Sequence, residues 1–233
     1  MTRELRELVA TGCQVLDFVG QGDLIWGHVS ARDPEGRGIW LKCSYLGFEE
    51  VRWEDVILVS WDGDVLEGDR PRHSEWPIHS EIMLARPDVN AVVHTHAQAP
   101  VAFASLGVPL RPVSHEGNMF TPDVPRFTET GDLIVTRDLG RSVAKAYGDN
   151  TACLLVNHGV AVGGADVQSA VMASYFLDRA CDTQLRAMSA GGWAQWSPVG
   201  EAREKRDRMY TPKLVHGAWD YLVRRMRGIE PGR

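Results

Sequence analysis

Two histidines in the stretch 90–96, Asn-Ala-Val-Val-His-Thr-His, are well placed to do chemistry. The stretch is typical of a short β-strand, and side chains two residues apart on a strand point to the same face. His94 and His96 therefore share one face, where two imidazoles can chelate a single metal ion. A pair of polar residues at the end of an ordinary strand would give the same pattern, so this motif alone leaves both interpretations open.

Two further ligand-type residues stand at the ends of predicted elements. Ser74 is expected to cap a helix, which holds Glu75 near the helix N-terminus, and His158 follows a predicted buried strand at 151–156. Glu75 would also serve simply to complement the helix dipole. Three neutral imidazoles and one carboxylate are nevertheless the set expected of a catalytic site for one divalent metal ion. Zinc, manganese, cobalt and iron(II) all suit such a nitrogen-rich site.

The elements that must position these residues follow from hydrophobic periodicity and from Gly and Pro breaks. We predict helices over 3–19, 74–86, 98–106, 138–147 and 166–190 and within 201–227, and strands over 25–32, 39–42, 56–61, 90–96, 151–156 and 160–162. The stretch 121–131 is rich in Pro, Thr and Asp and is predicted to be a surface loop. No repeat, low-complexity segment or linker interrupts the pattern, so we expect one domain over residues 1–233.

Composition narrows the possible classes of protein. A net charge of −6 argues against binding to nucleic acid, which requires a basic surface. No apolar run approaches the roughly 20 residues of a membrane span, and the N-terminus carries charge where a signal peptide would be apolar. The four cysteines are widely spaced and match no zinc or redox motif, so we expect reduced thiols in a cytoplasmic protein.

The motifs, taken in order, resemble the class II aldolase/adducin family. The resemblance rests on Gly-His-Val-Ser at 27–30, Ser-Glu-Trp at 74–76, Ala-Val-Val-His-Thr-His at 91–96 and Asn-His-Gly at 157–159, and it covers about residues 5–190. It implies a single three-layer α/β/α domain with a mostly antiparallel central sheet. It also implies a homotetramer with active sites at subunit interfaces. By this likeness His94, His96 and His158 are the metal ligands and Glu75 is the catalytic acid/base.

The sequence departs from the family's sugar-phosphate aldolases where those enzymes bind phosphate. The corresponding positions here are His28, Ser44, Tyr45, His73 and Ser74. Tyr45 stands where a glycine would let phosphate approach the backbone, and histidines replace Asn and Ser donors. The aldolases also carry a His-Tyr pair downstream of the metal strand. Here the equivalent is His115 followed by Glu116, so the tyrosine is missing unless Tyr45, Tyr210 or Tyr221 replaces it.

The altered pocket suits a planar carboxylate-bearing substrate better than a sugar phosphate. Arg72 would bind a carboxylate in bidentate fashion and Tyr45 would stack on a ring, with Lys42, His28 and His73 nearby. Arg72 and Lys42 would also be explained as ordinary surface charges. The family resemblance extends to decarboxylases of hydroxylated aromatic acids such as 3,4-dihydroxyphthalate, and this is the function that we expect.

Three other interpretations stay open. The first is an aldolase, resembling L-fuculose-phosphate aldolase, that cleaves a sugar phosphate or a small hydroxy-aldehyde. The second is a non-haem iron oxygenase on the same scaffold, and the third is a binding-only, adducin-like module without metal. In every enzymatic case the expected partner is a small molecule, which for the decarboxylase is a carboxylate.

Overall fold

The computed structural model describes residues 2–192 and 195–229. Its centre is an eight-stranded sheet in the order β4-β3-β2-β1-β5-β8-β7-β6. The strands are β1 (His28–Arg32), β2 (Gly38–Lys42), β3 (Val56–Ser60), β4 (Val65–Glu67), β5 (Ala91–Thr95), β6 (Arg126–Phe127), β7 (Ala152–Leu155) and β8 (Gly159–Gly164). All neighbours pair antiparallel except β6 and β7, which are parallel.

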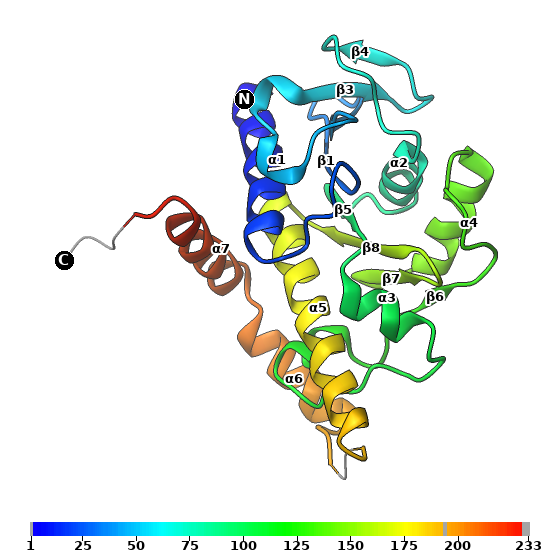
Figure 1. Cartoon of the computed structure of the whole chain (residues 1–233), viewed down its shortest axis with the longest axis vertical. Coiled ribbons are helices and arrows are strands. Elements are labelled where there is room, and N and C mark those ends of the chain that lie inside the picture. The colour runs from blue at the N-terminus through cyan, green and yellow to red at the C-terminus, as the bar shows by residue number, and fades with distance from the viewer. Residues whose placement is uncertain (1, 193–194, 230–233) are drawn as a thin grey trace.

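Helices cover both faces of this sheet. They are α1 (Thr2–Phe18), α2 (Trp76–Ala85), α3 (Gln98–Ala104), α4 (Arg137–Tyr147), α5 (Val167–Ser189), α6 (Val199–Met209) and α7 (Pro212–Met226), with short 3-10 turns η1 (Phe48–Glu50), η2 (Trp53–Asp55) and η3 (Glu116–Phe120). Figure 1 shows α1 and α5 on one side of the sheet and α2 and α4 on the other. The predicted three-layer α/β/α fold with a mostly antiparallel sheet is confirmed.

Strand alternation divides the core into two layers. Along β5, Ala91 and Val93 pack into the layer beneath α1 and α5, whereas Val92 packs into the layer beneath α2 and α4. Because His94 lies two residues beyond Val92, it shares the face covered by α2. The α2 side of the sheet is therefore where the ligand-type residues must meet.

Several sequence predictions of element position need correction. The cap of α2 is Glu75, without a side-chain capping hydrogen bond, so the prediction of Ser74 as the cap is wrong. The segment 201–227 contains most of one helix and the whole of another, because Pro212 starts α7 after Tyr210 and Thr211 interrupt the helical pattern. The two-residue strand β6 lies inside the predicted loop 121–131, since its partner β7 supplies the hydrogen bonds that no local pattern encodes.

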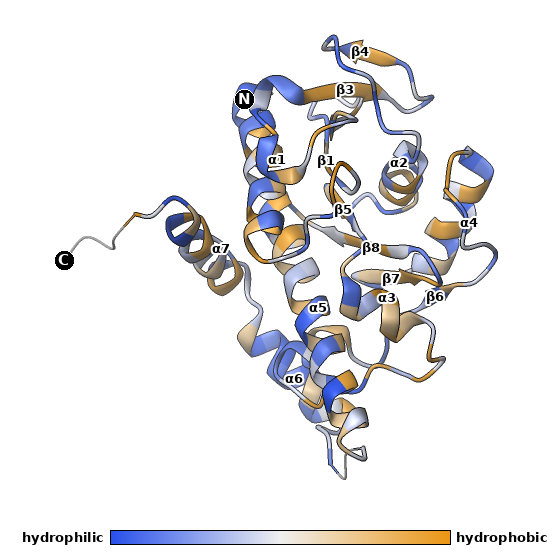
Figure 2. Cartoon of the chain, in the orientation of Figure 1, coloured by the Kyte–Doolittle hydropathy of each residue, from blue (hydrophilic) through white to orange (hydrophobic). Residues whose placement is uncertain are grey.

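The surface of the C-terminal part differs from the rest. Figure 2 shows hydrophilic colouring along α6, and Ala202 is the one residue of that helix that is buried. All four cysteines are free and buried, as expected of reduced thiols. None of the helices within residues 2–192 and 195–229 combines the length with the hydropathy that a membrane-spanning helix requires.

Candidate metal centre

The three predicted metal ligands and the predicted acid/base Glu75 meet on the α2 side of the sheet. Glu75 caps α2, His94 lies in β5, His96 follows that strand, and His158 lies in the turn between β7 and β8. The antiparallel register of β5 and β8 pairs His94 with Ala161, which brings the β7–β8 turn beside the end of β5. One ligand atom from each of the four residues lies within 4.8 Å of all the others. The chain thus brings together four residues from three separate segments.

The distances within this cluster are those of groups arranged around a common point. The Nε2 atoms of His94 and His96 are 3.1 Å apart. The two carboxylate oxygens of Glu75 lie 3.4 Å from Nε2 of His158 and 3.8 Å from Nε2 of His94. Imidazole nitrogens and a carboxylate are ligands for zinc and other transition metals. The donor set therefore fits one divalent cation.

Hydrogen bonds on the far side of two rings fix which nitrogen faces the cluster. Nδ1 of His94 donates to the carbonyl oxygen of Val160 over 2.9 Å, and Nδ1 of His96 lies 2.8 Å from a carboxylate oxygen of Asp23. Each ring therefore presents the lone pair of Nε2 to its neighbour. Metal-bound histidines usually donate the other ring N–H to a carbonyl or carboxylate in this way. No sequence motif marks Asp23, because its carboxylate reaches His96 only after β1 and β5 have paired.

The ring of His158 provides an independent test of whether a metal fits. Its side chain is 7% exposed, and neither ring nitrogen makes a hydrogen bond with the described part of the chain. A buried polar group without a partner costs about 1–3 kcal/mol. A metal ion bound at Nε2 would satisfy that nitrogen and remove part of this cost.

The protonation states of the cluster favour ligation. Burial acts to raise the pKa of Glu75, but His158, His94 and the amide of Ile134, which donates to it over 2.8 Å, lower the pKa to about 2. Burial lowers the pKa of His94 well below its usual value, with the nearby histidines adding to the effect. The result is a carboxylate anion beside a neutral imidazole, which are the forms that bind metals.

Gly159 allows the close approach of these segments. A Cβ atom at this position would lie 2.6 Å from the carbonyl oxygen of Thr95 and 2.8 Å from Cδ2 of His96. Real side chains do not tolerate such contacts, so the residue after His158 must be glycine in this arrangement. Asn157 beside it has a positive φ of 61°, as expected at a tight turn.

A second group of buried polar side chains lies directly behind the cluster. The ring of His28 stacks on that of His94 with centroids 4.9 Å apart, and it lies 4.4 Å from the ring of His73. Nε2 of His73 is 3.2 Å from Nζ of Lys42, and Nδ1 of His28 is 2.6 Å from Nε2 of His79. This group of His28, Lys42, His73 and His79 is called the histidine–lysine network below.

Lys42 is the one cation of this network, and the carboxylates of Glu49 and Glu50 act on it only from beyond salt-bridge distance. The residue is completely buried, and its ammonium contacts the carbonyl oxygens of Ile25 and Cys43 at 3.3 Å in addition to His73. No salt bridge joins it to a carboxylate of residues 2–192 or 195–229. Burial lowers the pKa of Lys42, and burial together with Lys42 lowers the pKa of His73 to about 3. An anion near His73 would stabilise this buried charge.

The other predicted substrate-binding residues lie around the network or elsewhere. Arg72 donates to the carbonyl oxygens of Gly63 and His73 and lies over the ring of Trp76. Tyr45 is 71% exposed with φ +67°, Ser44 is bonded through its backbone amide to Pro71, and Ser74 is exposed. These residues remain candidates for the outer part of a substrate site.

His115 lies apart from the four-ligand cluster in this chain. It is exposed at the start of η3, which packs on α5 and α6, and its carbonyl oxygen accepts a hydrogen bond from the hydroxyl of Tyr210 over 2.8 Å. Tyr210 is thereby brought beside His115 although 95 residues separate them. Neither residue hydrogen-bonds to or stacks on the cluster in the described structure.

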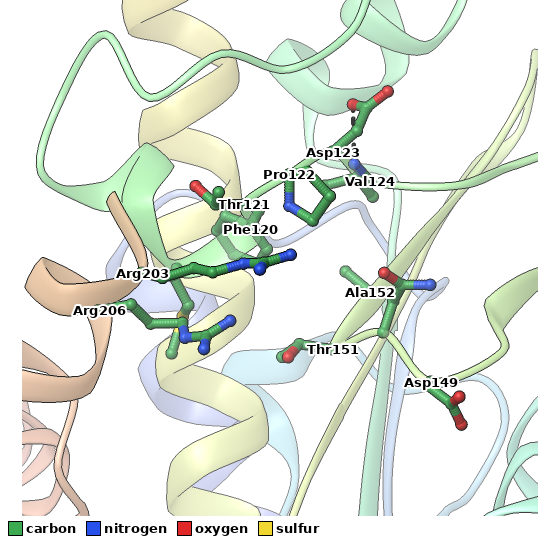
Figure 3. A pocket seen from close by; sticks show the side chains of 12 residues that line it. Phe120, Thr121, Pro122, Asp123, Val124, Asp149, Thr151, Ala152, Arg203 and Arg206 are labelled. Carbon is green, nitrogen blue, oxygen red and sulfur yellow. Dashed lines mark hydrogen bonds between the residues drawn. The ribbon is translucent and has the colours of Figure 1, made fainter. Parts of the chain in front are cut away.

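Two cavities show where small molecules have room. One, of about 250 Å³, lies beside His96 and is lined also by Asp23, Gln98, Asp178 and Asp182. A larger one, of about 380 Å³, lies near α6, and Figure 3 shows Arg203 and Arg206 extending from that helix toward it. The larger cavity shares no lining residue with the cluster. The candidate site is therefore identified by the metal-binding side chains of the cluster and not by the size of a cavity.

An α/β/α fold with a Glu/His3 cluster at the end of a sheet strand is a scaffold with the donor set to hold one divalent metal ion. The family model described as the Class II Aldolase and Adducin N-terminal domain matches residues 7–185. The chain belongs to this family.

Individual relatives include enzymes of two kinds. A 3,4-dihydroxyphthalate decarboxylase from Arthrobacter keyseri is 32% identical over 217 residues, which span 87% of this chain and 86% of that protein. A 5-deoxy-D-ribulose 1-phosphate aldolase from Bacillus thuringiensis is 28% identical over 191 residues, spanning 82% of this chain and 88% of that protein. The L-fuculose 1-phosphate aldolase from Glaciozyma antarctica PI12 superposes with a TM-score of 0.84 at 27% identity, covering 99% of this chain and 92% of that one. Both kinds are lyases.

Proposed function

We propose that this protein is a divalent-metal-dependent carboxy-lyase that removes carbon dioxide from a hydroxylated aromatic acid resembling 3,4-dihydroxyphthalate. The observation that supports this most is the position of the histidine–lysine network directly against the Glu/His3 cluster. It places a buried positive charge, without a salt-bridge partner among the described residues, two imidazole rings away from His94. The similarity to the decarboxylase from Arthrobacter keyseri supports the same reaction class.

In this proposal His94, His96 and His158 hold the metal and Glu75 moves the proton. A divalent cation at the cluster would supply Lewis-acid stabilisation for the negative charge that builds up when a carbon–carbon bond breaks. Glu75 is an anion at neutral pH, so its carboxylate first takes the proton from a hydroxyl group of the substrate. It then delivers that proton to the ring carbon, whose bond to the departing carboxylate supplies the electron pair. The hydroxyl group recovers its proton from water.

The histidine–lysine network would hold the carboxylate that stays on the ring. His73 and His28 lie between Lys42 and His94, so an anion bound against the two imidazoles would be close both to the buried ammonium and to the reacting atoms. Fixing the ring by a second attachment point orders the reacting groups, which is a large part of catalysis. Arg72, Tyr45, Ser44, Ser74 and His115 are proposed for the outer contacts.

An aldolase is the second candidate. The similarity to the aldolase from Bacillus thuringiensis favours it, and serines remain at positions 30, 44 and 74, where the family's aldolases have hydrogen-bonding residues. The two reactions share the same physical task, because each leaves an electron pair on carbon. They differ in the anion recognised, a carboxylate or a phosphate.

We also propose that the enzyme acts in the cytoplasm as a homotetramer with active sites at subunit interfaces. Leu24 and Trp26, which follow Asp23 in sequence, are 74% and 51% exposed. Apolar side chains gathered beside a site are typical of a surface that another chain covers. Light scattering of the purified protein should therefore give about four times the mass of one chain, and a monomer mass would contradict the assembly.

The direct test is carbon dioxide release by protein reconstituted separately with zinc, manganese, cobalt or iron(II). Release is expected from 3,4-dihydroxyphthalate and related hydroxybenzoates, and Glu75→Gln should lower turnover by a factor of about 100 to 10,000 while metal stays bound. Glu35→Gln, an exposed carboxylate in the β1–β2 turn, is the matched control and should be unaffected. Cleavage of L-fuculose 1-phosphate or 5-deoxyribulose 1-phosphate instead would establish the aldolase. Oxygen uptake with the iron form would establish an oxygenase.

A further inference from the structure

His79 is a buried histidine that belongs neither to the metal ligands nor to any motif. It lies in α2 with no exposed surface, and both ring nitrogens are hydrogen-bonded. Nε2 lies 2.6 Å from Nδ1 of His28, and Nδ1 lies 2.7 Å from the hydroxyl of Ser30. The three side chains form a line of short hydrogen bonds that ends at the ring stacked on His94.

The short hydrogen bonds restrict which ring nitrogens of His28 and His79 carry a hydrogen. Two imidazole nitrogens at 2.6 Å share one proton, so when both rings are neutral His28 and His79 must be the same tautomer, either both Nε2–H or both Nδ1–H. Burial lowers the pKa of His79 to about 3, although the carbonyl of Val92 acts to raise it, so this ring is neutral. The direction of the line is decided at its other end, by Ser30.

The hydroxyl of Ser30 has two acceptors to choose from. Nδ1 of His79 is 2.7 Å away, whereas the carbonyl oxygen of Val92 is 3.5 Å away. A hydrogen bond at 2.7 Å is much the stronger of the two. When Ser30 donates to Nδ1 of His79, Nε2 of His79 carries the hydrogen and donates to Nδ1 of His28. His28 then carries its hydrogen on Nε2.

We propose that His79 is a positioning residue that, together with Ser30, fixes His28 as a hydrogen-bond donor through Nε2–H for an oxygen of the substrate. Among the described residues no hydrogen bond involves Nε2 of His28, so this nitrogen is free to meet a ligand. Packing between the rings of His94 and His73 prevents the His28 ring from turning away. The identity of the acceptor as a substrate oxygen rests on the function proposed above. The tautomer of His28 follows from the hydrogen bonds alone and does not depend on that function.

Nitrogen-15 NMR of the zinc-loaded protein without substrate tests the tautomer directly. The signals of His28 are assigned by their loss in His28→Gln. Wild type should show His28 protonated at Nε2, and Ser30→Ala should convert it partly or wholly to the Nδ1–H form. Ser80→Ala is the matched control, because Ser80 is buried in the same helix and its hydroxyl has no partner. A wild-type His28 protonated at Nδ1 would overturn the inference whatever reaction the enzyme catalyses.

Two substitutions of His79 separate positioning from simple packing. Glutamine can accept from Ser30 through Oε1 and donate to His28 through Nε2, whereas leucine fills a similar volume without hydrogen bonds. We expect His79→Leu to raise KM for the aromatic acid about tenfold, which corresponds to the loss of one good hydrogen bond. The value of kcat should change little, and the metal content should be unchanged. His79→Gln should recover most of the loss. Equal losses in both variants would show that His79 serves packing alone.

If the wild-type protein releases no carbon dioxide from any aromatic acid, the proposed function fails while the NMR result remains decisive for the tautomer. Conversely, an active decarboxylase with His28 protonated at Nδ1 would keep the function and remove His79 from it.

Discussion

Asp23 is expected to tune metal affinity although it touches no metal. Its carboxylate lies 2.8 Å from Nδ1 of His96, where it fixes the tautomer and increases the basicity of Nε2. Loss of such a partner typically lowers metal affinity by about 10- to 100-fold, which is about 1.4–2.7 kcal/mol. Because the Asp23 side chain is 38% exposed, solvent screens its charge, and the charge itself should account for the smaller part.

The two substitutions at this position should therefore differ. Asp23→Asn keeps an acceptor for Nδ1–H and should weaken binding by up to about tenfold, whereas Asp23→Ala removes it and should weaken binding by about 10- to 100-fold. Affinity is measured by zinc competition with a chromophoric chelator. Asp182→Asn is the matched control, because Asp182 lines the same cavity but pairs with Arg186. Unchanged affinity in both Asp23 variants would refute the role assigned to this carboxylate.

Three other predictions concern stability and substrate affinity. Gly159→Ala should destabilise the fold by about 1–3 kcal/mol in urea titrations and lower the metal content, because the added Cβ would clash with the carbonyl oxygen of Thr95. A variant of wild-type stability would show that the turn relaxes to accommodate the Cβ. In metal-free protein the free energy of unfolding should fall as the pH drops from about 6.5 toward 3. Over this range His79 binds a proton in the unfolded chain but stays neutral in the folded protein, where its pKa is about 3. Each such histidine contributes up to about 1.4 kcal/mol per pH unit, so His79→Gln should give a shallower slope between pH 7 and 5, and parallel slopes would contradict the assignment. Lys42→Met should raise the midpoint temperature of thermal unfolding, because a buried charge without a salt-bridge partner is costly. The same substitution should raise KM for the aromatic acid. A lower midpoint with an unchanged KM would show that Lys42 does not take part in anion binding.

The elements that the sequence predicted best are those with a strong local pattern. The two-residue spacing of His94 and His96 required one face of a strand, and the structure brings their Nε2 atoms to 3.1 Å. Glu75 and His158 were identified from the family motifs and from their places at element ends, and the structure gathers both with the two histidines. Their roles as acid/base and metal ligand remain predictions that the experiments above test.

What the sequence could not predict depends on pairing between distant segments. Asp23 reaches His96, and His79 reaches His28, only because β1 pairs with β5 and α2 packs on the same face. The cap of α2 was misplaced by one residue because Ser74 has the better intrinsic propensity, whereas tertiary contacts of Glu75 with Ile134 and His158 decide where the helix begins. Lys42 carries no sequence signal of burial, since lysines are almost always exposed.

The most direct test of the central claim is the number of metal ions bound per chain, measured by elemental analysis after reconstitution and desalting. Wild type should bind about one divalent ion per chain, His158→Ala should bind almost none, and His216→Ala, whose ring pairs with Asp166 away from the cluster, should bind as wild type does. A wild-type protein without bound metal, or a His158→Ala variant with a full complement, would contradict the assignment of the Glu75, His94, His96 and His158 cluster as a metal centre.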